Sequence, residues 1–396
     1  MAPNHALVYG ASGITGWAIV NAILEGYPTP ETFGKVTALT NRPLTAEAAL
    51  WPASPKLQIV SGIDLLTDKG QAGLEAEMQA RVPDIETVTH VYFFAYIMDP
   101  DPKKEVDINV ELIRRAVTAV ENLAPTTLTF VVLPTGTKAY GVHLLRDNFP
   151  FHKDLPLRET LPRIPEPYAS QMFYYGQTDM LSAMSKGKRW TWCEIIPDVI
   201  IGFVPNNNVY CLAQQLGTYL SLYRELHGEG AEVVFPGTTA SWTNLFIESS
   251  QDMCAKVSIV ASLQPATTSE QRYNAADNNR PASWSEKWPV VAAYFGLKGV
   301  APPAAGGAGP DPVIYLADHF AEWQALEKKH GLQTGRVGNE RNYGGFVQFI
   351  MSMFDFDRQM DMTKCFAMMG KHKVEYTTQE TFYTAFDRFR KAKIIP

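Results

Sequence analysis

Short apolar runs alternate with longer stretches of mixed polarity along the first half of the chain. Most of these runs are apolar at nearly every position, which is typical of parallel strands covered on both faces. The predicted strands are Ala6–Tyr9, Val36–Leu39, Leu57–Val60, His90–Phe94, Leu128–Leu133 and Thr191–Ile196. The predicted helices between them are Trp17–Leu24, Gln71–Arg81, Val106–Leu123 and Tyr174–Lys186. This order predicts an α/β fold with an open, doubly wound parallel sheet.

The pattern changes in the second half of the chain. We expect a sheet-forming part over residues 1–205 and a mostly helical part over residues 206–396, interleaved with the sheet. The second part is predicted to contain a helix at Leu212–Leu226, a strand at Glu232–Phe235, a Gly- and Pro-rich loop at Ala301–Pro312 and mainly helices over Val313–Pro396. The Met and Phe residues of this last stretch indicate core packing or the wall of an apolar pocket.

The composition excludes several classes of function. The 396 residues include 35 Lys and Arg against 41 Asp and Glu, a formal net charge of −6. Without a block of basic residues, the chain has no electrostatic footprint for nucleic acid or an anionic membrane. No apolar stretch approaches the roughly 18 to 20 residues of a membrane helix, and no export signal is evident, so we expect a cytoplasmic protein.

The four cysteines, Cys193, Cys211, Cys254 and Cys365, lie far apart and form no CxxC pair. We expect reduced, mostly buried thiols and no metal site. The sequence leaves the oligomeric state open, with a homodimer as one alternative.

A glycine motif directly follows the first predicted strand. Gly10, Gly13 and Gly16 occur in the order GxxGxxG and open the first predicted helix. Glycines at this place permit a tight turn and let the backbone approach a pyrophosphate, whose charge is met by free amides at the helix N-terminus. The context predicts a Rossmann-type site for a dinucleotide.

The next two strand ends indicate which dinucleotide is bound. The second strand is followed by Asn41 and Arg42, with no acidic residue for a ribose 2′-hydroxyl. An arginine here can pair with a 2′-phosphate, which favours NADPH, although Arg42 could also be a solvated loop residue. Asp64 and Leu65 follow the third strand, where an aspartate can bind the adenine amino group or cap a helix.

Two further segments carry candidate catalytic groups. Lys138 lies just past a buried strand in Thr135-Gly-Thr-Lys-Ala-Tyr140, at the sheet edge where ligands bind. Met172-Phe-Tyr-Tyr-Gly-Gln-Thr-Asp179 opens a predicted helix. Short-chain dehydrogenases usually carry Tyr-x-x-x-Lys there, but the fourth residue after Tyr175 is an aspartate. Taken alone, Tyr175 could equally be a packed tyrosine at a helix start, and Lys138 a surface lysine.

These segments resemble the PRISE family, the progesterone 5β-reductase and iridoid synthase-like reductases, which are atypical short-chain dehydrogenases. The family carries TGTKHY and NFYYxxED segments where this chain has the two segments described above. Further matches are Thr89-His-Val-Tyr-Phe-Phe, Ile201-Gly-Phe-Val-Pro205, Phe235-Pro-Gly-Thr-Thr-Ala-Ser-Trp242 and Lys391-Ala-Lys-Ile-Ile-Pro396. The resemblance extends over nearly the whole chain.

The resemblance implies roles for individual residues. It assigns catalysis to Lys138 and to Tyr175, the second tyrosine of its segment. It implies an NADPH site built from Gly10, Ser12, Gly13, Ile14, Thr15, Gly16, Asn41, Arg42, Asp64, Leu65, Ala95, Lys138, Tyr175 and Pro197, and a substrate pocket that includes Tyr96 and Tyr140. Family members often carry two arginines where Asn41 and Arg42 stand, and histidine is usual at Ala139.

The family reduces activated C=C bonds. Hydride passes from the nicotinamide to the β-carbon of an enone or enal, and the carbonyl oxygen gains negative charge that needs a donor. The resemblance implies that Tyr175 donates to this oxygen and that Lys138 stabilises the tyrosinate. We therefore expect an NADPH-dependent reductase of a small hydrophobic enone or enal, with a specialised metabolite as the kind of substrate that the resemblance implies. The alternatives are a carbonyl reductase, a cofactor-dependent cyclase or isomerase, and a non-catalytic NADP(H) sensor.

Overall fold

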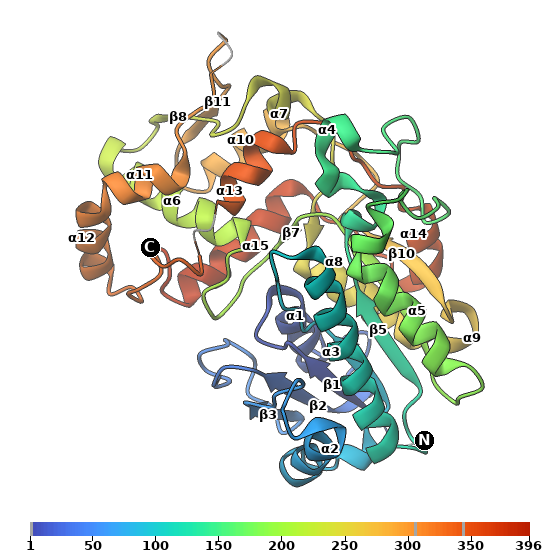
Figure 1. The fold of residues 1–396 in the computed structure, drawn as a ribbon. Coiled ribbons are helices and arrows are strands. Elements are labelled where there is room, and N and C mark those ends of the chain that lie inside the picture. Colours follow the sequence, from blue (N-terminus) through green and yellow to red (C-terminus); the bar gives the residue numbers. More distant parts are fainter. Residues whose placement is uncertain (1–2, 305–306, 343–344) are drawn as a thin grey trace.

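A seven-stranded parallel sheet forms the centre of the computed structural model, which describes residues 3–304, 307–342 and 345–396 (Figure 1). The strand order is β3-β2-β1-β4-β5-β6-β10. Its strands are β1 (Asn4–Tyr9), β2 (Phe33–Thr40), β3 (Leu57–Ser61), β4 (His90–Phe93), β5 (Phe130–Pro134), β6 (Thr191–Pro197) and β10 (Gln271–Ala275). The predicted doubly wound α/β fold is confirmed, and each strand predicted in the first half is present.

The seventh strand was not predicted. β10 lies in the second half of the chain and pairs in parallel with β6, Tyr273 opposite Ile195. Its sequence, QRYNA, mixes polar and apolar residues and lacks the continuous apolar run of the other strands. The polar residues are used inside the structure, because the side chain of Asn274 is fully buried and hydrogen-bonded. The second half of the chain therefore completes the sheet of the first half.

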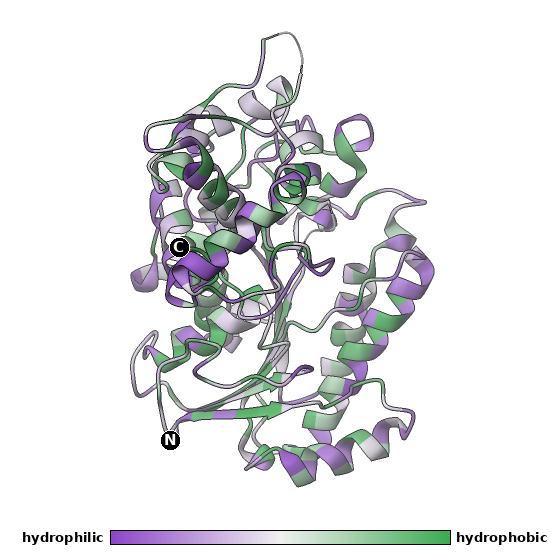
Figure 2. Ribbon diagram, turned by 90° about the vertical axis from the view of Figure 1, so that its left-hand side faces the viewer, coloured by the Kyte–Doolittle hydropathy of each residue, from purple (hydrophilic) through white to green (hydrophobic). Residues whose placement is uncertain are grey.

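Helices cover both faces of the sheet. On one face lie α1 (Ile14–Leu24) and α8 (Gln251–Ser262), and on the other lie α2 (Gly70–Arg81), α3 (Pro102–Leu123) and α5 (Phe173–Ser185). Alternate residues of β1 enter the two separate hydrophobic cores, with Ala6 and Val8 in one and Leu7 and Tyr9 in the other. This double coverage explains why the strands are continuously apolar. Figure 2 shows hydrophilic and hydrophobic residues distributed around the long helices beside the sheet.

The second half adds a mainly helical layer beyond one end of the sheet (Figure 1). Its longer elements are α6 (Leu212–His227), α10 (Trp284–Ala293), α11 (Pro312–Asp318), α12 (Phe320–His330), α14 (Thr363–Met369), α15 (Thr378–Lys391) and the strand pair β8 (Glu232–Val234) and β11 (Lys298–Val300). Shorter elements of the second half are α7 (Thr239–Thr243), β9 (Ser249–Ser250), α9 (Pro265–Thr268) and α13 (Phe346–Gln348). Two short elements, α4 (Leu145–Asn148) and β7 (Ile200–Ile201), belong to the first half. The predicted loop at Ala301–Pro312 has no helix or strand before Pro312 in its described part, and residues 305–306 lie outside the described residues.

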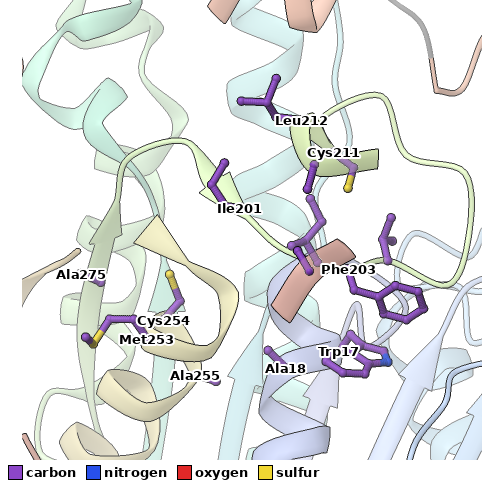
Figure 3. Close-up of a cluster of buried hydrophobic side chains, with 14 of the residues drawn as sticks. Trp17, Ala18, Ile201, Phe203, Cys211, Leu212, Met253, Cys254, Ala255 and Ala275 are labelled. Atoms are coloured by element: carbon purple, nitrogen blue, oxygen red, sulfur yellow. The ribbon is translucent and has the colours of Figure 1, made fainter. Parts of the chain in front are cut away.

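The two halves share one core. The ring of Trp17 on α1 meets Phe203 edge-on, with centroids 5.2 Å apart (Figure 3). The guanidinium of Arg388 on α15 lies 4.8 Å from the centroid of the Trp17 ring. The indole N–H of Trp17 donates to the Ala49 carbonyl at 2.6 Å, which attaches the loop after β2 to the same helix. Helix α1, the loop after β2 and the C-terminal helix α15 therefore pack together as one unit.

All four cysteines are buried and free, as expected. In the described ranges, no helix combines the length and the apolar character needed to cross a bilayer.

Candidate active site

The glycine turn lies where the sheet changes its direction of winding. β2 and β3 extend to one side of β1, whereas β4, β5 and β6 extend to the other, and ligands bind at such a switch point. Gly10 has φ +71°, and a Cβ there would lie 2.6 Å from the carbonyl oxygen of Phe94, next to Ala95. A Cβ on Gly16 would lie 2.3 Å from the Gly10 carbonyl oxygen. Only glycine fits these two positions without displacing the backbone.

The N-terminus of α1 is suited to an anion. The helix begins at Ile14 after Gly13, with no side chain capping it and no acidic residue in its first turn. Its first amide N–H groups therefore have no intrahelical acceptor, and the helix dipole adds positive potential. Ser12, Gly13, Ile14 and Thr15 converge on this end, so the residues present fit the pyrophosphate of a dinucleotide.

Arg42 is held against the second half of the chain. It is half-buried, and its Nη2 donates to the Asn207 carbonyl oxygen at 3.3 Å. Burial and the positive charge of Arg341 lower the pKa of its guanidinium. Asn41 beside it is exposed. Arg42 is thus more constrained than a freely solvated loop arginine.

Asp64 occupies a turn and not a helix cap. Its Oδ1 accepts a hydrogen bond from the Leu66 amide at 2.9 Å, while α2 begins only at Gly70, so the alternative of a helix cap is wrong. The Asp64 side chain is exposed at the end of β3, whereas Leu65 is buried. The carboxylate lies at the sheet edge where the resemblance places the adenine.

Lys138 stands at the carboxyl edge of the same sheet. β5 runs into Thr135 and Gly136 and then into a short 3₁₀ helix, Thr137–Tyr140, from which the Lys138 side chain is exposed. It lines a cavity of about 220 Å³ together with Glu105 of α3, Phe173 of α5 and neighbouring residues. The lysine is therefore free to meet a ligand at this edge.

His143 lines the same cavity. Burial and then the nearby charge of Lys138 lower its pKa to about 4, so its imidazole is neutral at pH 7. It brings no second positive charge to the lysine.

The structure places the Tyr175 hydroxyl away from this cavity. The hydroxyl donates to the Ala139 carbonyl oxygen at 2.7 Å and accepts from the Ile164 amide at 2.9 Å, and the residue is 6% exposed. Arg163 lies over its ring at 4.7 Å. The Tyr175 proton is engaged by a backbone carbonyl in this structure, so a donor role toward a substrate would require this hydrogen bond to be exchanged.

The preceding tyrosine faces the sheet edge instead. A Cβ placed on Gly136 would lie 3.4 Å from the Tyr174 hydroxyl oxygen and 3.4 Å from the Pro197 carbonyl oxygen, at the ends of β5 and β6. No hydrogen bond ties this hydroxyl to another of the residues that the structure describes. Burial and the carboxylates of Glu105 and Glu194 raise its pKa, so the phenol keeps its proton at neutral pH. The sequence interpretation assigned catalysis to Tyr175 and gave Tyr174 no role.

The geometry of helix α5 explains why Tyr174 and Tyr175 point in different directions, one toward the carboxyl edge of the sheet and the other not. Successive helical residues point about 100° apart, because 3.6 residues complete a turn, so Tyr174 and Tyr175 cannot share a direction. The tandem pair in the sequence was a signal that one of them faces the ligand edge. It did not say which one.

Tyr140 belongs to the core and not to a substrate pocket. It is fully buried, its hydroxyl donates to Asn274 Oδ1 at 2.7 Å, and Arg272 lies 5.6 Å from its ring. Arg272 also donates to Glu194 at 2.7 Å, and Glu194 accepts from Thr135 Oγ1 at 2.7 Å. The expectation of substrate contact at Tyr140 is therefore corrected, because the side chain is buried and its hydroxyl is hydrogen-bonded to Asn274 of β10.

An aromatic wall borders the cavity. Tyr96 stacks on Phe173 with centroids 5.3 Å apart and an interplanar angle of 21°, and Tyr210 lies 6.3 Å from Tyr96. The Tyr96 hydroxyl donates to Glu105, which lines the cavity. Tyr96 and Tyr210 are 37% and 40% exposed, so both present apolar surface to a ligand. Glu105 and Tyr210 were not anticipated, since only the fold brings them to this edge.

The chain is similar in sequence to a known family and to several known proteins. A sequence profile described as the PRISE-like Rossmann-fold domain matches residues 6–396. The short chain dehydrogenase ausT of Aspergillus calidoustus is 38% identical over 396 residues, covering 99% of this chain and 94% of that protein. The short chain dehydrogenase sirQ of Leptosphaeria maculans is 33% identical over 404 residues, covering 99% and 97%. The 3-oxo-Delta(4,5)-steroid 5-beta-reductase of Arabidopsis thaliana is 25% identical over 395 residues, covering 99% and 93%.

Solved structures share the fold at lower identity. UDP-glucose 4-epimerase of Thermus thermophilus, in complex with NAD, is 16% identical, with a TM-score of 0.57 over 98% of this chain and 99% of that chain. The glycine turn, the exposed lysine after β5 and the profile match over almost the entire length lead to one assignment. The chain belongs to the PRISE-like Rossmann-fold family, a family of oxidoreductases within the short-chain dehydrogenase superfamily.

Proposed function

We propose that the protein is an NADPH-dependent reductase of the activated C=C bond of a small hydrophobic enone or enal, of the kind found in specialised metabolism. The observation that carries this proposal is that the candidate catalytic side chains and the glycine turn lie at the same edge of the sheet. Lys138 and the Tyr174 hydroxyl lie at the ends of β5 and β6, and the glycine turn lies at the end of β1.

The cofactor end is supported by the chemistry of its donors. Unpaired amides at the start of α1 suit a pyrophosphate, and Arg42 suits a 2′-phosphate. When bound, NADPH supplies the hydride. Gly10 and Gly16 keep the backbone clear for its close approach, Ala95 lies next to Gly10, and Pro197 at the end of β6 lies next to Gly136.

The substrate end is supported by charge and polarity. During reduction of an enone, negative charge gathers on the carbonyl oxygen, and a donor already in place lowers the barrier. Tyr174 donates its proton to this oxygen, and the ammonium of Lys138 stabilises the tyrosinate that forms. The raised pKa of Tyr174 keeps the donor protonated before the reaction. Tyr96, Phe173 and Tyr210 provide the apolar wall.

Tyr175 has a positioning role in this scheme. Its hydrogen bond to the Ala139 carbonyl joins the first turn of α5 to the residue that follows Lys138. The bond therefore sets the lysine loop relative to the helix that carries Tyr174. Its second bond, from the Ile164 amide, attaches the intervening loop to the same point.

The names of the relatives support the reaction class, first as oxidoreductases and then as enone reductases. Two carry the name of short chain dehydrogenase, and the Arabidopsis relative is named for reduction of a 3-oxo-Δ4,5 steroid, which is an enone. Reduction of a carbonyl group would use the same tyrosine and lysine, so product analysis is needed to separate the two outcomes.

The test follows NADPH absorbance with 2-cyclohexen-1-one and methyl vinyl ketone, with NADH in parallel. We expect faster oxidation of NADPH and a product saturated at the C=C bond by gas chromatography. A product that is only the allylic alcohol would replace the proposal with carbonyl reduction. Tight NADPH binding without turnover on either ketone would contradict an enzymatic role toward enones.

A further inference from the structure

The loop that follows β2 begins with Asn41 and Arg42, so it carries a single cation next to the end of the strand. The second half of the chain folds onto this place. Asn207 accepts from Arg42 Nη2 at its carbonyl oxygen, and its Oδ1 accepts from Asn342 Nδ2 at 2.8 Å. The residue before Asn342 is Arg341, whose side chain is exposed. Asn207 therefore links the β2 loop to the segment that carries another arginine.

That segment is firmly attached. Asn342 Oδ1 accepts from the Asn208 amide at 2.8 Å, and Asn342 Nδ2 also donates to the Arg336 carbonyl oxygen at 2.8 Å. Arg336 Nη1 donates to Asn207 Oδ1 at 3.2 Å. With Asn342 fully buried, the backbone at residue 341 is fixed beside the Arg42 loop while its own side chain stays in solvent.

A cavity of about 410 Å³ opens at the junction of the two halves. The first half contributes Pro43, Leu44, Thr45, Ala48, Ser61 and Pro205, and the second contributes Asn206, Gln333 and Arg336. The Nδ2 of Asn206 is buried there without an acceptor among the described residues. An unsatisfied buried donor costs free energy and indicates that an acceptor belongs beside it. The cavity thus offers hydroxyl, amide and cationic groups at the ends of β2 and β3.

The half-buried Arg42 and the exposed Arg341 have no carboxylate partner among the described residues. Their mutual repulsion, after burial, contributes to the lowered pKa of Arg42. A phosphate dianion placed near both groups would remove this repulsion and gain charge-assisted hydrogen bonds.

We propose that Arg341 acts with Arg42 in recognising the 2′-phosphate of the cofactor, so that the C-terminal half supplies a second cation beside the β2 loop. This inference rests on the proposed use of NADPH. Specificity for the phosphorylated cofactor is then shared between the two halves of the chain, and binding joins the β2 loop to the segment around Asn342.

The test measures binding and not turnover. Isothermal titration calorimetry gives the dissociation constants of NADP⁺, NAD⁺, adenosine 2′,5′-bisphosphate and adenosine 5′-monophosphate for the wild type and for Arg341→Ala. We expect Arg341→Ala to weaken both 2′-phosphorylated ligands roughly ten-fold, as for one charge-assisted contact, with less than about two-fold change for the other two. Arg280→Ala, an exposed arginine on another loop, is the matched control and should change neither pair.

A rescue variant tests the same idea in the opposite direction. Asn41 is exposed, so Asn41→Arg can restore a second cation from the β2 loop itself. The double variant Asn41→Arg with Arg341→Ala should regain the preference for the 2′-phosphorylated ligands. Thermal unfolding of each variant shows whether the fold is retained.

The outcomes separate this inference from the proposed function. A wild type that binds NAD⁺ as tightly as NADP⁺ would contradict the proposed NADPH use, and the inference would fall with it. A wild type that prefers NADP⁺, combined with a folded Arg341→Ala protein that keeps the whole preference, would overturn the inference alone. In that case Arg42→Ala should remove the preference by itself.

Discussion

Replacing Tyr174 and Tyr175 one at a time by phenylalanine separates the two roles proposed for this pair. Each change removes a single hydroxyl group and keeps the ring. At Tyr175 the cation–π contact with Arg163 therefore persists, and only the bonds to Ala139 and Ile164 are lost. The two variants are matched controls for each other.

The structure sets the size of the two effects. In Tyr175→Phe, a buried carbonyl and a buried amide lose their partner, and each unsatisfied group costs about 1–3 kcal/mol, so we expect the free energy of unfolding to fall by about 2–4 kcal/mol. In Tyr174→Phe, no hydrogen bond among the described residues is lost, so we expect a change within about 0.5 kcal/mol. Loss of an oxyanion donor should lower kcat about 10²–10³-fold in Tyr174→Phe.

Urea unfolding followed by circular dichroism measures stability, and NADPH oxidation with 2-cyclohexen-1-one measures kcat. Tyr175→Phe should keep most of its kcat per folded molecule under conditions where it is fully folded, apart from the loss that follows a displaced lysine loop. A Tyr174→Phe protein with wild-type kcat, beside a folded and stable Tyr175→Phe protein without activity, would refute the reasoning and restore the original interpretation of Tyr175.

Three further predictions concern the rest of the site and the core. Lys138→Met should leave the free energy of unfolding unchanged, because the side chain is exposed, but should lower kcat/KM about 10²-fold. Loss of the lysine charge should also raise the pKa of His143 from about 4, as measured by NMR titration. An unchanged kcat/KM would exclude the lysine from catalysis. Gly16→Ala places a Cβ 2.3 Å from a carbonyl oxygen and should weaken NADP⁺ binding more than ten-fold by calorimetry. Gly217→Ala is the control, because its Cβ would meet its neighbours at 3.5 Å or more, and it should not weaken binding. Equal binding of NADP⁺ by both variants would contradict a role of the glycine turn in binding the cofactor. Burial lowers the pKa of His90 from 6.5 to about 4, so between these pH values the unfolded chain binds more protons than the folded chain. The free energy of unfolding should therefore fall by up to about 3 kcal/mol as pH falls through this range, and the contribution of His90 should be constant above pH 7. His90→Gln should make the pH dependence measured by urea unfolding shallower, and an unaltered slope would contradict this prediction.

Local patterns in the sequence account for the fold of the first half. Continuous apolar runs such as Ala6–Tyr9 predict strands that are covered on both faces, and the positive φ of Gly10 and the contact of Gly16 with Gly10 are steric limits that act within a few residues. Because these causes are local, they can be recognised without knowing the tertiary structure. The same holds for the exposed lysine, whose place just after a strand puts it at the carboxyl edge of a parallel sheet.

Long-range packing decided what the sequence left open. β10 is a strand because β6 offers it a hydrogen-bonding edge, and its polar residues become core partners that bury Tyr140. The roles of Tyr174 and Tyr175 depend on how α5 is rotated against the sheet, which neighbouring residues in a helix cannot reveal. Arg341 stands beside Arg42 only because Asn207 holds two segments, far apart in the chain, at the same place. Periodicity and sterics therefore determined the elements of the first half, whereas contacts between distant parts of the chain determined β10 and the directions of Tyr174, Tyr175 and Arg42.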